Sequence, residues 1–243
     1  MNSTEIEKAL VNAAWPYWEC EGEIAKRYFA GATDDDHVFY LRAQLWKELH
    51  PVDGLFNGLH RELKDLVDRF PEVDKTTDRH EYHFLLTQLT EEFNHYVMLA
   101  DILEHLLGRK IAAEDTIQLP EEKKLGEVRR GYVESGDELT KAAVGFTEGG
   151  GATLFREGAK LSGSTVNEMT ADAMRTIYED EKDHYAEQAK ICVGLIRSDE
   201  DLKRMTDAIR TISLQRVKMR AEMFPGAMTP TEIDAFISAN ARN

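Results

Sequence analysis

Hydrophobic residues recur along most of the chain at the spacing of one face of an α-helix. The clearest stripe is formed by Leu55, Leu59, Leu63, Leu66 and Phe70 and stops before Pro71. The strict alternation of apolar and polar residues that is typical of half-buried strands is hard to find. The pattern therefore predicts an all-α protein.

Capping residues, glycines and prolines divide this pattern into separate helices. The expected helices cover about 4–30, 34–70 with a break near Pro51, 76–107, 137–161, 165–197 and 199–224, followed by a short one from Thr231. The polar stretch 108–136 is expected to be a connection. Because no linker or low-complexity segment divides the chain, we expect one domain over 1–243.

Composition narrows the range of partners and compartments. The chain has 30 Lys and Arg against 45 Asp and Glu, a net charge of −15, which makes it a poor match for nucleic acid. Two cysteines, Cys20 and Cys192, are too few for a disulfide framework or a thiolate zinc site. The first residues include Glu5 and Glu7 where a signal peptide would have basic residues, and the chain has no apolar run of about 18 residues. We therefore expect a cytoplasmic protein that does not contact membranes.

Two of the expected helices carry the same pattern, Glu-x-x-His-Tyr. Glu92 and His95 form the first pair, and Glu181 and His184 form the second. Residues three apart lie on one face of a helix, so each pair can direct a carboxylate and an imidazole to one point. Both pairs sit within mostly apolar stripes, with Leu99 one turn from His95. A buried carboxylate is costly unless it is paired or coordinated, so the pattern favours a metal site over two exposed polar pairs.

Two Glu-x-x-His pairs on two helices resemble the ligand pattern of the ferritin-like di-metal carboxylate proteins. The resemblance covers about 52–197 and implies a four-helix bundle with a long crossover connection. The segments 4–51 and 199–240 would then form extra N- and C-terminal helices that flank the bundle. The resemblance also implies one further Glu ligand from each of the other two core helices.

In an antiparallel pair of helices, residues equally far from the turn lie side by side. This rule locates the two further ligands. Glu62 is expected opposite Glu92, and Glu148 opposite Glu181, with Glu157 as the alternative if the triple glycine 149–151 forms a loop. The expected metal ligands are therefore Glu62, Glu92, His95, Glu148, Glu181 and His184.

The resemblance implies two iron ions, or manganese, or a mixed Mn/Fe pair. The expected activity is O2-dependent oxidation of a small organic substrate by a diiron enzyme, with a manganese catalase or peroxidase and a ferroxidase or iron-handling protein as alternatives. The expected partners are the small substrate and O2, an electron-donor protein, and a second copy in a homodimer.

Plain structural roles compete with functional ones at three further features. Tyr178, one turn before Glu181, is a candidate catalytic residue, although core packing is the commoner role for such a tyrosine. Asp180 is expected to be solvated. Arg216 and Arg220 form a basic stripe that is expected to face solvent.

Overall fold

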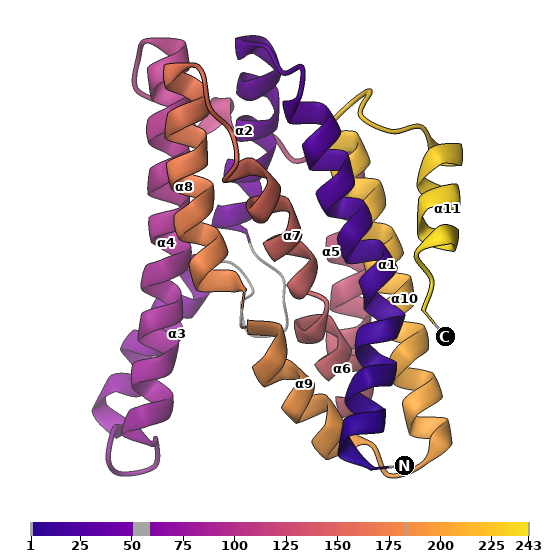
Figure 1. The fold of residues 1–243 in the computed structure, drawn as a ribbon. Helices are drawn as coiled ribbons and strands as arrows, with labels where there is room; N and C mark the ends of the chain where they lie inside the picture. Colours follow the sequence, from indigo (N-terminus) through magenta and orange to yellow (C-terminus); the bar gives the residue numbers. More distant parts are fainter. Residues whose placement is uncertain (1, 51–58, 183, 243) are drawn as a thin grey trace.

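The computed structural model describes residues 2–50, 59–182 and 184–242, without the side chains of Ala113, His184 and Glu187 (Figure 1). Its α-helices are α1 (Ser3–Phe29), α2 (Asp34–Leu49), α3 (Leu59–Arg69), α4 (Arg79–Leu107), α5 (Pro120–Glu134), α6 (Glu138–Phe146), α7 (Gly149–Gly158), α8 (Thr165–Glu181), α9 (His184–Leu195), α10 (Asp199–Met223) and α11 (Pro230–Ala239). Short 3-10 helices cover Phe70–Glu72 and Ala113–Asp115. These ranges contain no β-strand, which confirms the all-α prediction. No helix within them is long and apolar enough to cross a membrane.

Local capping explains where several helices begin and end. At the start of α2, the Thr33 side chain accepts a hydrogen bond from the amide of Asp36, whose carboxylate accepts one from the Thr33 amide in return. Asp78 caps the first turn of α4. The same helix ends at Gly108, whose φ of 65° suits glycine better than any residue with a side chain. Such signals are local, which is why the sequence predicted these boundaries well.

Tertiary packing gives the terminal helices a different place from the one expected. Helix α1 packs mainly on α7 and α10, and α2 packs on α4 (Figure 1). Leu10 and Ile24 of α1 and Ile209 of α10 are fully buried in the main hydrophobic core. Elements expected to flank a bundle formed by 52–197 therefore contribute to the centre of the molecule.

Two expected helices are interrupted, and one expected connection is largely helical. The helix expected over 137–161, with an interruption at 149–151, is instead split into α6 and α7 at Thr147 and Glu148, and the three glycines form the first turn of α7. The expected helix over 165–197 is split into α8 and α9, while the stretch 108–136 contains α5. The stretch was expected to be a connection because α5 is mostly polar, and its buried residues Glu122, Leu125, Gly126 and Arg129 include only one large apolar side chain.

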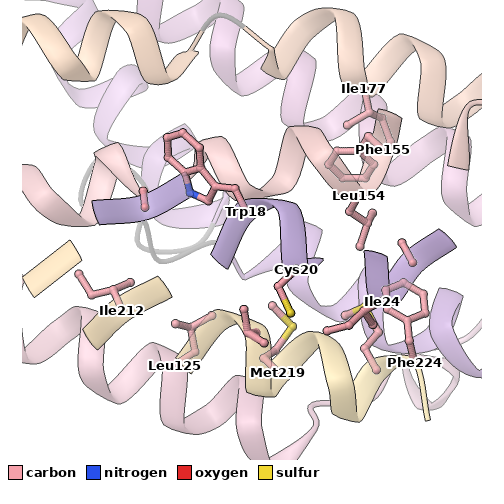
Figure 2. Close-up of a cluster of buried hydrophobic side chains, with 14 of the residues drawn as sticks. Trp18, Cys20, Ile24, Leu125, Leu154, Phe155, Ile177, Ile212, Met219 and Phe224 are labelled. Carbon is pink, nitrogen blue, oxygen red and sulfur yellow. The ribbon is translucent and has the colours of Figure 1, made fainter. Parts of the chain in front are cut away.

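The hydrophobic core joins α1, α7 and α10 (Figure 2). In this cluster, Ile24 of α1 lies near Leu154 of α7, and Cys20 of α1 lies near Met219 of α10. Burial of such side chains stabilises the fold by roughly 1.5–3 kcal/mol each relative to exposure.

An ion cluster is buried within the same helices. The Glu21 carboxylate on α1 accepts hydrogen bonds from Nε and Nη2 of Arg216 at 2.9 and 3.1 Å. It also accepts one from Nε of Arg220 at 3.2 Å. Burial raises the pKa of Glu21, but the two guanidinium groups outweigh it and the net shift is downward. The expectation that Arg216 and Arg220 face solvent is therefore wrong, because each is only 1% exposed and paired inside the core.

We expect Glu21→Ala to lower the free energy of unfolding by about 3–5 kcal/mol, because it leaves two guanidinium groups buried without their carboxylate. Urea denaturation at pH 7 measures this loss. Glu23→Ala is the control, since Glu23 pairs with the partly exposed Arg27 at 2.8 Å and should cost less than about 1 kcal/mol. Similar, small losses in both variants would contradict the assigned importance of the buried cluster.

Candidate functional site

Polar side chains from several helices converge on a small internal space, here called the central cavity. Its acidic and imidazole lining consists of Glu48, Glu92, His95, Glu148 and Glu181. Its basic lining consists of Lys47, Arg129, Arg216 and Arg220. The cavity volume is about 30 Å³, which has room for an ion and a water molecule but not for an organic substrate.

The structure brings together four of the six predicted metal ligands. Glu92, His95, Glu148 and Glu181 all line the central cavity. Glu62 lies half-buried on α3 and is not part of this lining. The side chain of His184 lies outside the described part of the chain.

His95 lies at the meeting point of α4 and α8. Its ring is 1% exposed, and its Nε2 lies 3.1 Å from Oδ2 of Asp180. Its Nδ1 lies 4.0 Å from Glu92 and 3.9 Å from Glu181. Asp180 was expected to be solvated, but its carboxylate instead lies at hydrogen-bond distance from Nε2 of this imidazole. In a neutral ring, an Nε2–H bond to Asp180 leaves the Nδ1 lone pair facing two carboxylates.

Glu48 at the end of α2 is the cavity residue that sequence reasoning missed. It is 5% exposed, and Gln44 donates a hydrogen bond to its carboxylate. One ligand atom each from Glu48, Glu92 and His95 lie within 4.8 Å of one another. A signal was present, because Glu48 follows Leu41 and Leu45 on the buried side of its helix. Glu48 precedes the segment 52–197 that the ferritin-like resemblance covers, so that resemblance implied no ligand at this position.

Glu148 lies opposite two guanidinium groups. Arg129 donates a hydrogen bond to its carboxylate, and Nη1 of Arg216 lies 3.7 Å away. Burial alone would raise the pKa of Glu148, but the positive charges of Arg129 and Arg216 lower it to about 2. The alternative residue, Glu157, pairs with Arg156 and Lys160 and does not line the cavity. Of the two candidates, Glu148 is therefore the one that faces this site, as an ionised carboxylate.

Tyr178 lies beside a different space. It lines a second, larger cavity of about 280 Å³ together with Trp15, Trp18 and Tyr185. We call this space the aromatic cavity. Tyr178 is not part of the central cavity lining, so its predicted role next to the metal ligands has no geometric support here.

Comparisons with known proteins identify a similar fold. No family model matches the sequence, and no curated protein does. Among solved structures, the chain is similar to a TenA homolog from Pseudomonas syringae pv. tomato, with a TM-score of 0.61 and 13% sequence identity. The match covers 92% of this chain and 95% of that one. The chain therefore has a TenA-like helical fold.

This likeness overturns the ferritin-like assignment and the functions inferred from it. The matched fold spans nearly the whole chain, including the terminal helices that the ferritin-like interpretation set aside as additions. A Glu-x-x-His pair requires only one turn of helix, so it can face an internal cavity in more than one helical fold. The diiron oxygenase assignment, with its catalase and ferroxidase alternatives, rested on that resemblance and is withdrawn.

We expect Glu148→Gln to lower the free energy of unfolding at pH 7 by at most about 3 kcal/mol, because it removes a carboxylate whose pKa is depressed from 4.5 to about 2. A depressed pKa stabilises the folded state above pH 4.5, and this stabilisation is lost as the pH falls toward 2. Urea denaturation should therefore show that the free energies of unfolding of the wild type and of Glu148→Gln converge as the pH is lowered from 7 to 3.

Glu138→Gln is the matched control, since Glu138 is largely exposed and lies 3.8 Å from Lys141. Its effect should be small at every pH. A Glu148→Gln effect that is independent of pH would contradict the depressed pKa.

Proposed function

We propose that the protein binds a divalent metal ion in the central cavity through Glu48, Glu92 and His95. The observation that carries this proposal is the convergence of their three ligand atoms within 4.8 Å. Glu48 and His95 are buried, and the three residues come from α2 and α4, which pack directly on each other. Rigid helices hold ligands at fixed separations better than loops do.

The ligand types favour iron(II) or manganese(II). Two carboxylates are hard donors and an imidazole is a borderline one, and this mixed set suits iron(II) or manganese(II). The thiols of Cys20 and Cys192 have pKa values raised by burial to about 12, and neither lines the cavity. The sequence-based prediction of two iron ions stays a prediction, since His184, one of its ligands, has no described side chain.

The surroundings of His95 support the same proposal. A hydrogen bond from Nε2 to a carboxylate, here Asp180, is the arrangement that orients metal-binding histidines and selects their tautomer. It directs Nδ1 toward Glu92 and Glu181. A cation among these three groups would relieve the repulsion between the lone pair and the carboxylates.

We infer that the site serves an enzyme that activates water. A bound divalent ion would lower the pKa of a coordinated water molecule toward neutrality. The cavity has room for such a water beside an ion. Glu148 is a poor proton acceptor because its pKa is about 2. Glu181, 13% exposed and 3.9 Å from Nδ1 of His95, is better placed to accept the proton. Activation of a water molecule for hydrolysis is the chemistry that these residues suit best.

We expect protein grown with both metals supplied to contain about one iron or manganese ion per chain, measured by elemental analysis. His95→Ala and Glu48→Ala should bring the content close to zero. Asp180→Asn should weaken binding roughly ten- to hundredfold, because it alters only the support of His95.

Glu62→Gln is the control, because Glu62 was predicted as a ligand but lies outside the cavity lining. It should retain the metal. A wild-type protein that stays metal-free even after anaerobic addition of Fe(II) would refute the proposal.

A further inference from the structure

Exposed apolar side chains gather on one part of the molecule, the antiparallel pair formed by α3 and α4 with the short 3-10 helix Phe70–Glu72 between them. Among the residues that the structure describes, all the large apolar side chains that are exposed, except Ile191, belong to this pair. The exposed fraction reaches 63% at Val67 and 67% at Phe70. Single exposed apolar residues are common on protein surfaces, but a contiguous group of them marks an interaction surface.

Most of these side chains lie on one side of the pair. We call them the hairpin face, which consists of Leu63, Val67 and Phe70 from the first helix and its end and Leu86, Phe93 and Val97 from α4. Their spacings of three, four or seven residues place them on one face of each helix. The rings of Phe70 and Tyr82 lie 6.1 Å apart, and Leu86 follows Tyr82 by one turn, so the two stripes face the same side.

Helix α3 has little other packing. Within the described part of the chain, it packs mainly on α4 and on the 3-10 helix that follows it, and it lies at the edge of the molecule (Figure 1). Its buried residues are Leu59 and Leu66, so α4 covers one part of its apolar stripe and leaves the rest uncovered. Two antiparallel helices with an uncovered apolar stripe are half of a four-helix bundle.

The area of the hairpin face matches the area that a stable dimer needs. If a large apolar side chain has roughly 200 Å² of surface, the exposed fractions of the face correspond to roughly 600 Å² of apolar surface. A standard interface buries roughly 800 Å² of each partner, and about 65% of a homodimer interface is apolar, which amounts to roughly 500 Å² per copy. The hairpin face can therefore supply the whole apolar part of such an interface.

The charges of α3 favour a second copy of this chain as the occupant. The helix carries three cations and three carboxylates, which are Arg61, Lys64 and Arg69 and Glu62, Asp65 and Asp68. This helix is therefore neutral in a chain of net charge −15. Two such chains repel each other least where their surfaces are neutral, and a neutral face does not attract a strongly charged partner. A two-fold axis brings the same apolar stripe against itself.

We propose that the hairpin face is the interface of a homodimer, in which α3 and α4 of two copies form a four-helix arrangement about a two-fold axis. The proposal goes beyond the metal site and needs no bound ion. Helical spacing places the hairpin face on the side of α4 opposite the buried His95. A partner copy would therefore pack on the outer side of the helix whose inner side carries His95 and Glu92.

Sedimentation equilibrium measures both the mass and the dissociation constant of the dimer. We expect the wild type to have twice the chain mass at micromolar concentration. Val67→Glu should weaken the dimer roughly 100-fold or more, because the interface would bury a carboxylate without a partner. Leu63→Glu should do the same and is the second variant. Both side chains are more than half exposed in the single chain, so both variants should fold, which circular dichroism verifies.

Phe84→Glu is the matched control. Phe84 is 42% exposed and lies about 200° around α4 from Leu86, on the opposite side of the helix from the hairpin face. The substitution adds the same charge to the same pair of helices and should leave the dissociation constant nearly unchanged. His95→Ala should remain dimeric, so failure of the metal site and failure of this interface can be told apart.

Three results would overturn the proposal. The first is a wild-type protein that is monomeric at micromolar concentration. The second is a dimer whose dissociation constant is unchanged in folded Val67→Glu and Leu63→Glu, since the contact would then lie elsewhere. The third is a dimer that Phe84→Glu weakens as strongly as Val67→Glu does, since added charge alone would then explain the loss.

Discussion

The buried contact between Glu21 and the guanidinium groups of Arg216 and Arg220 is the interaction on which the rest of the structure depends. A charge inside a protein must be paired closely, so this contact fixes the height of α1 relative to α10. Nη1 of Arg216 lies 3.7 Å from the Glu148 carboxylate, which also accepts a hydrogen bond from Arg129. The same charges that join the helices therefore keep Glu148 ionised at the central cavity.

This cluster also explains why glycines stand where α7 begins. A Cβ atom at Gly150 would lie 2.2 Å from Oε1 of Glu21 and 2.9 Å from the Trp18 ring. Only glycine, which has no Cβ atom, can lie so close to a buried carboxylate and an indole ring. The result is a thin turn with a small charged cavity and a larger aromatic one beside it. Metal binding is proposed for the small charged cavity.

Much of the candidate site was predictable because its geometry is local. Glu92 and His95 lie on one face through their spacing, and distance from a hairpin turn placed Glu148 opposite Glu181. Glu48 and Asp180 were missed for another reason. Each acquires its place from a neighbouring helix, Glu48 through the packing of α2 on α4 and Asp180 through the packing of α8 on α4. Glu62 lies outside the cavity lining, because its height in the hairpin does not determine which way its side of the helix faces.

The sequence by itself determined the helical class, most helix boundaries, and the shared helix face of Glu92 and His95. These properties depend on hydrogen bonds and side-chain spacing within a few residues. Only the tertiary structure decided that α1 and α10 lie at the centre, that Arg216 and Arg220 are buried, and that the fold is TenA-like instead of ferritin-like. Such outcomes depend on which helices pack together, because contacts between distant segments decide whether a charge is buried or stays in water. A pattern confined to one helical turn does not encode those contacts.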